Sequence, residues 1–122
     1  MQISGAHVII SEKIQFEVNE AKIKPESSGL LDELADVIKA NPKLKKIQVE
    51  GHSSSEGDPK ANLKLSDDRA KAVVAALEQR GVPSGVLVAK GFGSTMSIAP
   101  NDTEEGREKN RRVDFVILEP KP

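Results

Sequence analysis

Two polar segments of the sequence carry residue types that bind ligands or perform catalysis. The first is Gly51-His52-Ser53-Ser54-Ser55-Glu56-Gly57-Asp58, which sets three hydroxyls beside a histidine and two carboxylates. The second spans residues 101–112 and contains four basic residues, Arg107, Lys109, Arg111 and Arg112. Hydroxyl and carboxylate oxygens accept hydrogen bonds and guanidinium groups donate them, so the two segments together suit a polar or charged ligand.

The serines beside His52 suggest a hydrolase, with Asp58 as the group that orients the histidine. Such a triad requires nucleophile, base and orienting group to meet in space. Adjacent residues at the end of a strand point to opposite faces, and the segment lacks a sharp nucleophile-elbow sequence. We therefore expect no catalytic residue and no enzyme activity.

Metal ligands are scarce in this sequence. His7 is the only other histidine, and there is no cysteine. The run from Asn101 to Glu105 has oxygen ligands but lacks the alternating spacing of a calcium loop. We expect His52 to have a structural role, hydrogen-bonding the loop backbone at a strand end, and we expect no metal site and no cofactor.

The composition narrows the class of partner. The 122 residues include 18 basic and 19 acidic side chains, so no strong field attracts the chain to nucleic acid. Three Phe, without Trp or Tyr, also leave few platforms on which bases could stack. No apolar run reaches the length of a membrane span, so we expect neither nucleic-acid binding nor direct membrane insertion.

The spacing of apolar residues alternates between a strand period and a helix period. Strands are predicted at 7–16, 44–51, 86–91 and 113–117, and helices at 25–40, at 66–80 and after Thr103. Asp58-Pro59 marks a short helical start, and Ser66 is the expected N-cap of the second helix. The order predicts an α+β fold, a two-layer β-α-β-α-β-β sandwich with its helices on one face of a four-stranded mixed sheet. We expect a single domain over residues 1–122, with a core from about 7 to 118.

A series of short motifs runs through the whole chain. They are Gly51-His52, Asn62, Leu65-Ser66, Arg69-Ala70, Gly91-Phe92-Gly93, Asn101, Gly106-Arg107 and Asn110-Arg111-Arg112-Val113. Their order and spacing, from about Ile9 to Ile117, resemble the outer-membrane-protein-A C-terminal (OmpA-like) family. That family includes peptidoglycan-associated lipoprotein and the periplasmic domains of flagellar motor stators. The resemblance implies that the final strand runs antiparallel between the first and the second.

The resemblance also implies a function. Such domains bind peptide stems of peptidoglycan non-covalently in the periplasm of Gram-negative bacteria and anchor an outer-membrane or envelope protein to the cell wall. On this reading, residues 1–122 are a domain excised from a larger envelope protein, and the domain is a monomer or a weak dimer. The alternative is an OmpA-like fold with lost or altered wall binding that serves as a protein–protein interaction module.

The family binds both ends of the zwitterionic group of diaminopimelate. Its arginine for the carboxylate corresponds to Arg69, and a planar guanidinium suits that role because it binds a carboxylate bidentately. Its aspartate for the ammonium corresponds to Ser54, which supplies no charge. Either Glu56 or Asp58 replaces that charge, or both are solvated and Asp58 caps a helix. The remaining predicted ligand-binding residues are Asn62, Leu65, Arg111 and Arg112.

Two simpler readings of the basic residues stay open. Arg69 could pair with its neighbours Asp67 or Asp68 instead of a ligand. In the cluster of residues 107–112, one arginine could pair with acidic loop residues while the others are solvated.

Overall fold

The computed structural model describes residues 2–5, 7–9 and 13–120. Its strands are β1 (Gln2–Ser4), β2 (His7–Ile9), β3 (Lys46–His52), β4 (Leu87–Gly93) and β5 (Arg112–Glu119). Its helices are the 3-10 turn η1 (Pro25–Ser27), α1 (Ser28–Ala40), α2 (Pro59–Gln79) and α3 (Glu104–Asn110). None of the helices in these ranges is long and apolar enough to cross a membrane.

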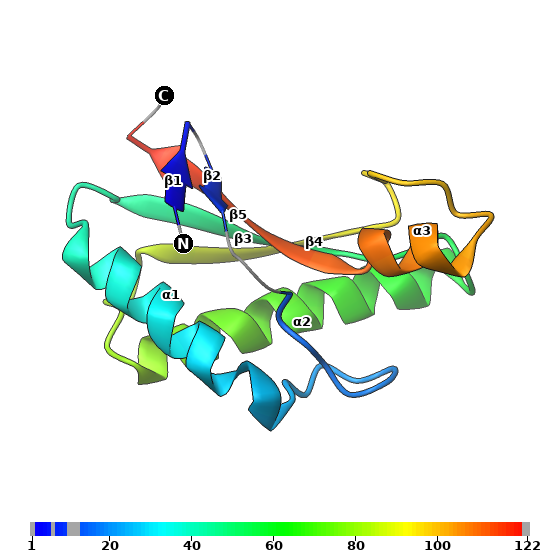
Figure 1. Ribbon diagram of the computed structural model, residues 1–122, viewed down its shortest axis with the longest axis horizontal. Coiled ribbons are helices and arrows are strands. Elements are labelled where there is room, and N and C mark those ends of the chain that lie inside the picture. Colours follow the sequence, from blue (N-terminus) through cyan, green and yellow to red (C-terminus); the bar gives the residue numbers. More distant parts are fainter. Residues whose placement is uncertain (1, 6, 10–12, 121–122) are drawn as a thin grey trace.

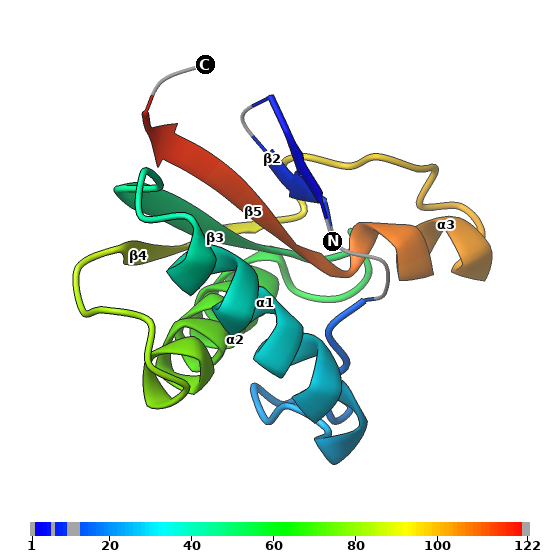
Figure 2. The same cartoon turned by 60° about the vertical axis from the view of Figure 1, so that its left-hand side comes forward.

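The strands form one mixed sheet in the order β1-β2-β5-β3-β4. The final strand, β5, lies antiparallel between β2 and β3, and β3 is parallel to β4. Both α1 and α2 lie on one face of this sheet, and α3 lies at the end where β5 begins (Figures 1 and 2). The predicted α+β two-layer fold and the predicted position of the last strand are confirmed.

The number of strands differs from the prediction of four. A fifth strand, β1, pairs antiparallel with β2, and Gly5 has a φ of 57° in the turn between them. A three-residue strand has too few alternating positions to be recognised from its pattern. The strand predicted at 7–16 corresponds to β2 over residues 7–9. Residues 10–12 of that prediction lie outside the described residues. Phe16, at its end, forms an isolated antiparallel bridge with Ile23.

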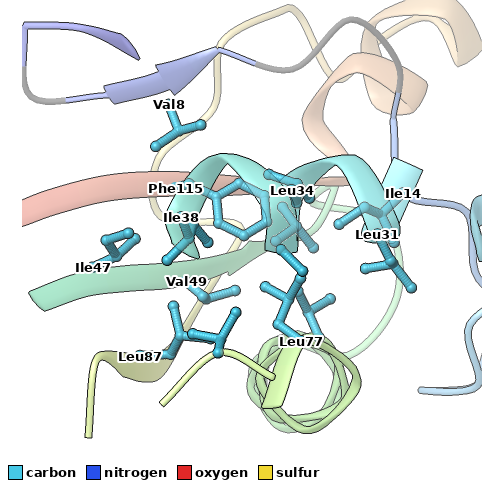
Figure 3. Packing of buried hydrophobic residues seen from close by; sticks show 14 of the residues in the cluster. Val8, Ile14, Leu31, Leu34, Ile38, Ile47, Val49, Leu77, Leu87 and Phe115 are labelled. Carbon is cyan, nitrogen blue, oxygen red and sulfur yellow. The ribbon is translucent and has the colours of Figure 1, made fainter. Parts of the chain in front are cut away.

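The core lies between the sheet and the two long helices. Apolar side chains at alternate positions of β3 and β5 turn toward those of α1 and α2, as Figure 3 shows for Leu34, Val49, Leu77 and Phe115. These four residues are at most 1% exposed. Burial of each such side chain contributes about 1.5–3 kcal/mol, so this aliphatic core accounts for the packing of helices on sheet without Trp or Tyr.

The second helix, α2, begins at Pro59, seven residues before Ser66, which was the predicted N-cap. The carboxylate of Asp58 accepts a hydrogen bond from the Ala61 amide at 3.2 Å, so Asp58 is the N-cap. The prediction for Ser66 is therefore wrong: its hydroxyl donates to the Leu63 carbonyl within the helix. The first turns of α2 are polar and largely exposed, so no apolar stripe marks them in the sequence.

Two glycines bring α2 against the ends of β3 and β4. A Cβ atom on Gly51 would lie 2.0 Å from the carbonyl oxygen of Ser66, and one on Gly91 would lie 2.4 Å from the amide nitrogen of Asp67. No side chain fits at these separations, so only glycine allows the helix backbone to lie directly on the strands. This contact positions the next turn of α2, with Arg69, beside the end of β3.

Candidate functional site

A small cavity lies where α2, the end of β3 and the start of β5 meet the segment before α1. It is lined by Ile14, Phe16, Gly51, His52, Arg69, Arg111, Arg112 and Val113. We call it the arginine cavity, because three of these residues are arginines. A concentration of guanidinium groups around one hollow favours an anionic ligand.

Arg69 is held in place by neutral groups only. Its guanidinium lies over the Phe16 ring, 4.9 Å from the centroid. Its Nε donates to the Glu20 carbonyl at 2.9 Å and its Nη2 to the Glu17 carbonyl at 3.3 Å. Within the described ranges no carboxylate lies at ion-pair distance from it. Burial, and then repulsion from Arg111, lowers the pKa of Arg69, but a guanidinium stays protonated at neutral pH.

The other two arginines of the cavity are neutralised. Arg111 forms ion pairs with Glu104 and with Glu108, the latter at 3.1 Å. Arg112 donates from Nε to Asp114 at 2.9 Å. Arg69 therefore differs from its neighbours, because it brings a positive charge to the cavity without a carboxylate in the described part of the chain.

The structure decides between the readings of the basic residues. Arg69 does not pair with its acidic neighbours, because Asp67 pairs with Lys71 and Asp68 pairs with Lys64, each at 2.9 Å. In the basic cluster, Arg111 pairs with Glu104 and Glu108 of α3. The other basic residues are not left solvated, because Arg107 pairs with Glu104, Lys109 with Glu105 and Arg112 with Asp114. The simple reading is thus wrong for Arg69, and for the cluster it holds only in that acidic partners are present.

Asparagines tie the two polar loops to each other. Asn101 Oδ1 accepts hydrogen bonds from the Ser55 amide at 3.1 Å and from Asn110 Nδ2 at 3.0 Å. Asn62 Nδ2 donates to the Glu56 carbonyl at 2.8 Å and to the Ser54 carbonyl at 3.4 Å. These amides shape the loop of residues 53–58, so the geometry gives Asn62 a role in positioning backbone.

The structure brings only part of the predicted site together. Arg69, Arg111 and Arg112 line the arginine cavity. Among the described residues, its wall does not include the other predicted residues, which are Ser54, Glu56, Asp58, Asn62 and Leu65.

The loop beside the cavity offers three candidate polar groups. Ser54 is only 5% exposed. Asp58 caps α2. Glu56 is exposed, and its carboxylate lies 3.5 Å from Arg107 Nε. Glu56 is therefore the carboxylate of this loop that is most easily redirected.

His52 has surroundings that differ from the sequence-based expectation. It is 3% exposed, and its ring stacks on Phe92 with centroids 5.3 Å apart. Its Nε2 lies 3.4 Å from a Glu50 oxygen and 3.6 Å from an Asp114 oxygen. Neither ring nitrogen has a hydrogen-bond partner in the described part of the chain, so the expected bond to the loop backbone is wrong. Strand alternation directs the side chain toward those of Glu50 and Asp114 instead.

Sequence reasoning missed the apolar half of the cavity. Ile14 and Phe16 were predicted to alternate in a strand, but nothing in that pattern shows that Phe16 packs against a helix some 50 residues later, at Arg69. Side chains that meet across such a separation are set by the fold and not by local spacing.

Comparison with known proteins identifies a family. Residues 15–111 match the model of the OmpA family. The outer-membrane lipoprotein YfiB of Pseudomonas aeruginosa is 33% identical over 108 residues, which cover 88% of this chain and 64% of YfiB. The peptidoglycan-binding protein ArfA of Mycobacterium tuberculosis is 35% identical over 114 residues, which cover 93% of this chain and 35% of ArfA. The chain thus spans less than two thirds of both relatives.

A solved structure shows the same fold. The periplasmic domain of Helicobacter pylori MotB superposes with a TM-score of 0.75 and 31% sequence identity. The superposition covers 86% of this chain and 71% of the MotB chain.

Proposed function

This chain belongs to the OmpA family, and we propose that it binds peptide stems of peptidoglycan non-covalently in the periplasm. In this role it anchors an outer-membrane or other envelope protein to the cell wall. The observation that carries the proposal is Arg69, a positioned guanidinium at a cavity with no carboxylate partner among the described residues. A relative named for peptidoglycan binding and another named as an outer-membrane lipoprotein support the same role.

The proposed ligand is the free end of diaminopimelate, which carries a carboxylate and an ammonium on one carbon. Two N–H groups of Arg69 are used by the Glu17 and Glu20 carbonyls, and the remaining ones are available to a ligand carboxylate. Stacking on Phe16 fixes the plane of the guanidinium, so little side-chain entropy is lost on binding. A ligand carboxylate would also relieve the repulsion between Arg69 and Arg111.

The ammonium of the ligand needs a different partner. Ser54 is neutral and buried, and the Asp58 carboxylate already accepts from the Ala61 amide. Glu56 is exposed and is engaged only at 3.5 Å by Arg107, so we assign the ammonium to Glu56. An exposed ion pair such as Glu56 with Arg107 contributes only about 0–1 kcal/mol to stability. Moving the Glu56 carboxylate from Arg107 to the ligand ammonium therefore costs little free energy.

A second candidate function is a protein–protein interaction module on the same fold. The observation that favours it is Ser54, because the position where the family has an aspartate is neutral and 5% exposed. On this reading the arginine cavity receives a carboxylate from a protein partner instead of the wall.

Sedimentation with purified diaminopimelate-type sacculi tests the proposal. Arg69→Ala should lower the affinity about tenfold or more, because charge-assisted hydrogen bonds contribute about 1.5–3 kcal/mol. Lys71→Ala is the matched control: it removes a positive charge from an exposed position on the same helix. Arg69→Lys keeps the charge but loses the bidentate geometry, so it should bind with intermediate or weak affinity.

Thermal unfolding of each variant is measured first, because Arg69 also holds the backbone at Glu17 and Glu20. If a folded Arg69→Ala protein binds as tightly as the wild type, Arg69 is structural and the proposal is wrong. If the wild type itself does not sediment with sacculi, the interaction module becomes the better reading.

A further inference from the structure

A second group of polar side chains lies on the face of the sheet that α1 and α2 leave uncovered. Residues 47, 49 and 51 of β3 face the helices, so alternation turns Glu50 and His52 to the opposite face. Asp114 of β5 is directly opposite Glu50 in the antiparallel register, which brings its side chain to the same face. We call Glu50, His52 and Asp114 the histidine cluster.

We propose that the histidine cluster binds a divalent transition-metal ion of the zinc class. One imidazole nitrogen and two carboxylate oxygens supply three protein ligands, and these atoms all lie within 4.8 Å of one another. Three protein ligands with water in the fourth position form a familiar coordination for zinc. Glu50 and Asp114 bring two negative charges to a divalent ion, and Arg112, which pairs with Asp114, adds one positive charge beside the site.

The distances within the cluster fit metal coordination better than hydrogen bonding. His52 Nε2 lies 3.4 Å from Glu50 Oε1 and 3.6 Å from Asp114 Oδ2, beyond the usual range of about 2.7–3.2 Å for an N–H···O bond. Ligands bound about 2.0–2.2 Å from a tetrahedral zinc ion are about 3.3–3.6 Å apart. Both separations match such an edge, so a metal ion can replace two poor hydrogen bonds with two good coordinate bonds.

The unpartnered nitrogens of His52 provide a second, independent observation. His52 is 97% buried, given its 3% exposure, and within the described ranges neither Nδ1 nor Nε2 has a hydrogen-bond partner. A buried polar atom without a partner costs about 1–3 kcal/mol, and metal coordination at Nε2 removes part of that cost.

Neighbouring side chains hold the three ligands in position. Gln48 Nε2 donates to Glu50 Oε2 at 2.7 Å, which leaves Oε1 facing His52. Arg112 Nε donates to Asp114 Oδ2 at 2.9 Å, and that oxygen retains a second lone pair for the metal. Phe92 stacks on the imidazole and fixes its plane. Such outer contacts are what orient the ligands of natural metal sites.

Calorimetric titration of the metal-stripped protein with Zn²⁺ alone tests the proposal, together with Co²⁺ absorption spectroscopy of the wild type. We expect one Zn²⁺ per chain and the intense visible bands of tetrahedral cobalt. Asp114→Asn should weaken Zn²⁺ binding at least about tenfold, equivalent to about 1.4 kcal/mol. Asp114 is 38% exposed at its side chain, so this change should leave the fold intact.

Two matched controls locate the ion. His7→Gln removes the other, exposed histidine and should leave Zn²⁺ affinity unchanged, as should Glu119→Gln, which removes an exposed carboxylate from β5. Equal Zn²⁺ affinity of wild type and Asp114→Asn would overturn the proposal, because the ion would then lie elsewhere. Absence of both Zn²⁺ binding and tetrahedral cobalt bands in the wild type would overturn it as well, without reliance on any variant.

Discussion

The arginine cavity and the histidine cluster lie at the same end of β3 and have opposite electrostatic character. The cavity gathers three arginines, one of them without a carboxylate partner among the described residues. The cluster gathers two carboxylates around a buried imidazole. Successive residues of one strand face opposite sides, so the short run Glu50-Gly51-His52 serves both regions. The two regions therefore adjoin: Gly51 lines the arginine cavity, Glu50 belongs to the histidine cluster, and His52 lies at both.

The two regions also differ in the contacts that position Arg69 and His52. Arg69 is positioned by backbone carbonyls and an aromatic ring, which orient its charge without neutralising it. His52 is positioned by a stacked ring and by burial, while its nitrogens stay unpartnered in the described part of the chain. In both regions the group proposed to bind a ligand is held by contacts that leave its binding atoms available.

Gly51→Ala should have the largest effect, because it disturbs the element shared by both regions. The new Cβ would lie 2.0 Å from the Ser66 carbonyl oxygen and would force α2 away from β3. We expect the free energy of unfolding to fall by about 1–3 kcal/mol or more, as in other overpacked sites. Urea unfolding measures the change.

Gly29→Ala is the control. Nothing lies within 4 Å of the new Cβ at this position, so the change should instead stabilise α1 by about 0.5–1 kcal/mol. Equal effects of the two changes would contradict the close contact.

Substitutions of Asp58 separate its capping role from ligand binding. Asp58→Ala removes the acceptor for the Ala61 amide and should cost about 0.5–2 kcal/mol of stability. Asp58→Asn keeps a good N-cap and should change neither stability nor sacculus binding by much. Glu56→Gln should weaken sacculus binding without loss of stability. If Asp58→Asn weakens binding and Glu56→Gln does not, the ammonium is bound by Asp58.

The pH dependence of stability tests the state of His52. Burial and Arg112 lower its pKa in the folded state, whereas the unfolded chain takes up the proton near the ordinary value of 6.5. Below that pH the unfolded state binds more protons than the folded state, so stability should fall as the pH falls. Urea unfolding at pH 7.5 and pH 5.5, values chosen around the ordinary histidine pKa, measures this change.

His52→Gln should reduce this slope, and His7→Gln should not. A wild-type stability that rises on acidification, with the rise lost in His52→Gln, would show a charged imidazole bound between Glu50 and Asp114. That result would contradict the lowered pKa of His52 in the folded state.

Ser54→Asp should have the smallest effect. It restores the family's charge beside the arginine cavity, but at a position only 5% exposed, so desolvation offsets part of the attraction. We expect affinity for sacculi to rise by a few-fold at most, and the gain to shrink as salt increases. Ser55→Asp, at an exposed neighbouring position, is the control. A gain at Ser55 equal to that at Ser54 would show a general charge effect and not a restored contact.

Local signals predicted most of the fold. Alternation identified β3, β4 and β5 within a few residues, and the short helix capped by Thr103 was predicted correctly. The start of α2 was wrong because the first turns of that helix lack buried apolar residues. Alternation and capping are encoded locally, whereas a polar helical turn is not distinguishable from a loop.

The two regions differed in how far they could be predicted. The resemblance to the family identified Arg69, and its ligand role remains a prediction. The histidine cluster was missed, although its residues stand at alternate polar positions of two strands. Recognising it requires the register that sets Asp114 opposite Glu50, and a single sequence does not fix that register. The contact of Phe16 with Arg69 was missed for the same reason.

The most direct test of the central claim compares two soluble muramyl peptides, one ending in diaminopimelate and one in lysine. Both keep a side-chain ammonium, but only diaminopimelate has the distal carboxylate that Arg69 is proposed to bind. Calorimetry should show tighter binding of the diaminopimelate peptide to the wild type, by about tenfold or more. In Arg69→Ala this preference should disappear, while the affinity for the lysine peptide stays the same. An equal loss of affinity for both peptides, or a preserved preference, would contradict the account.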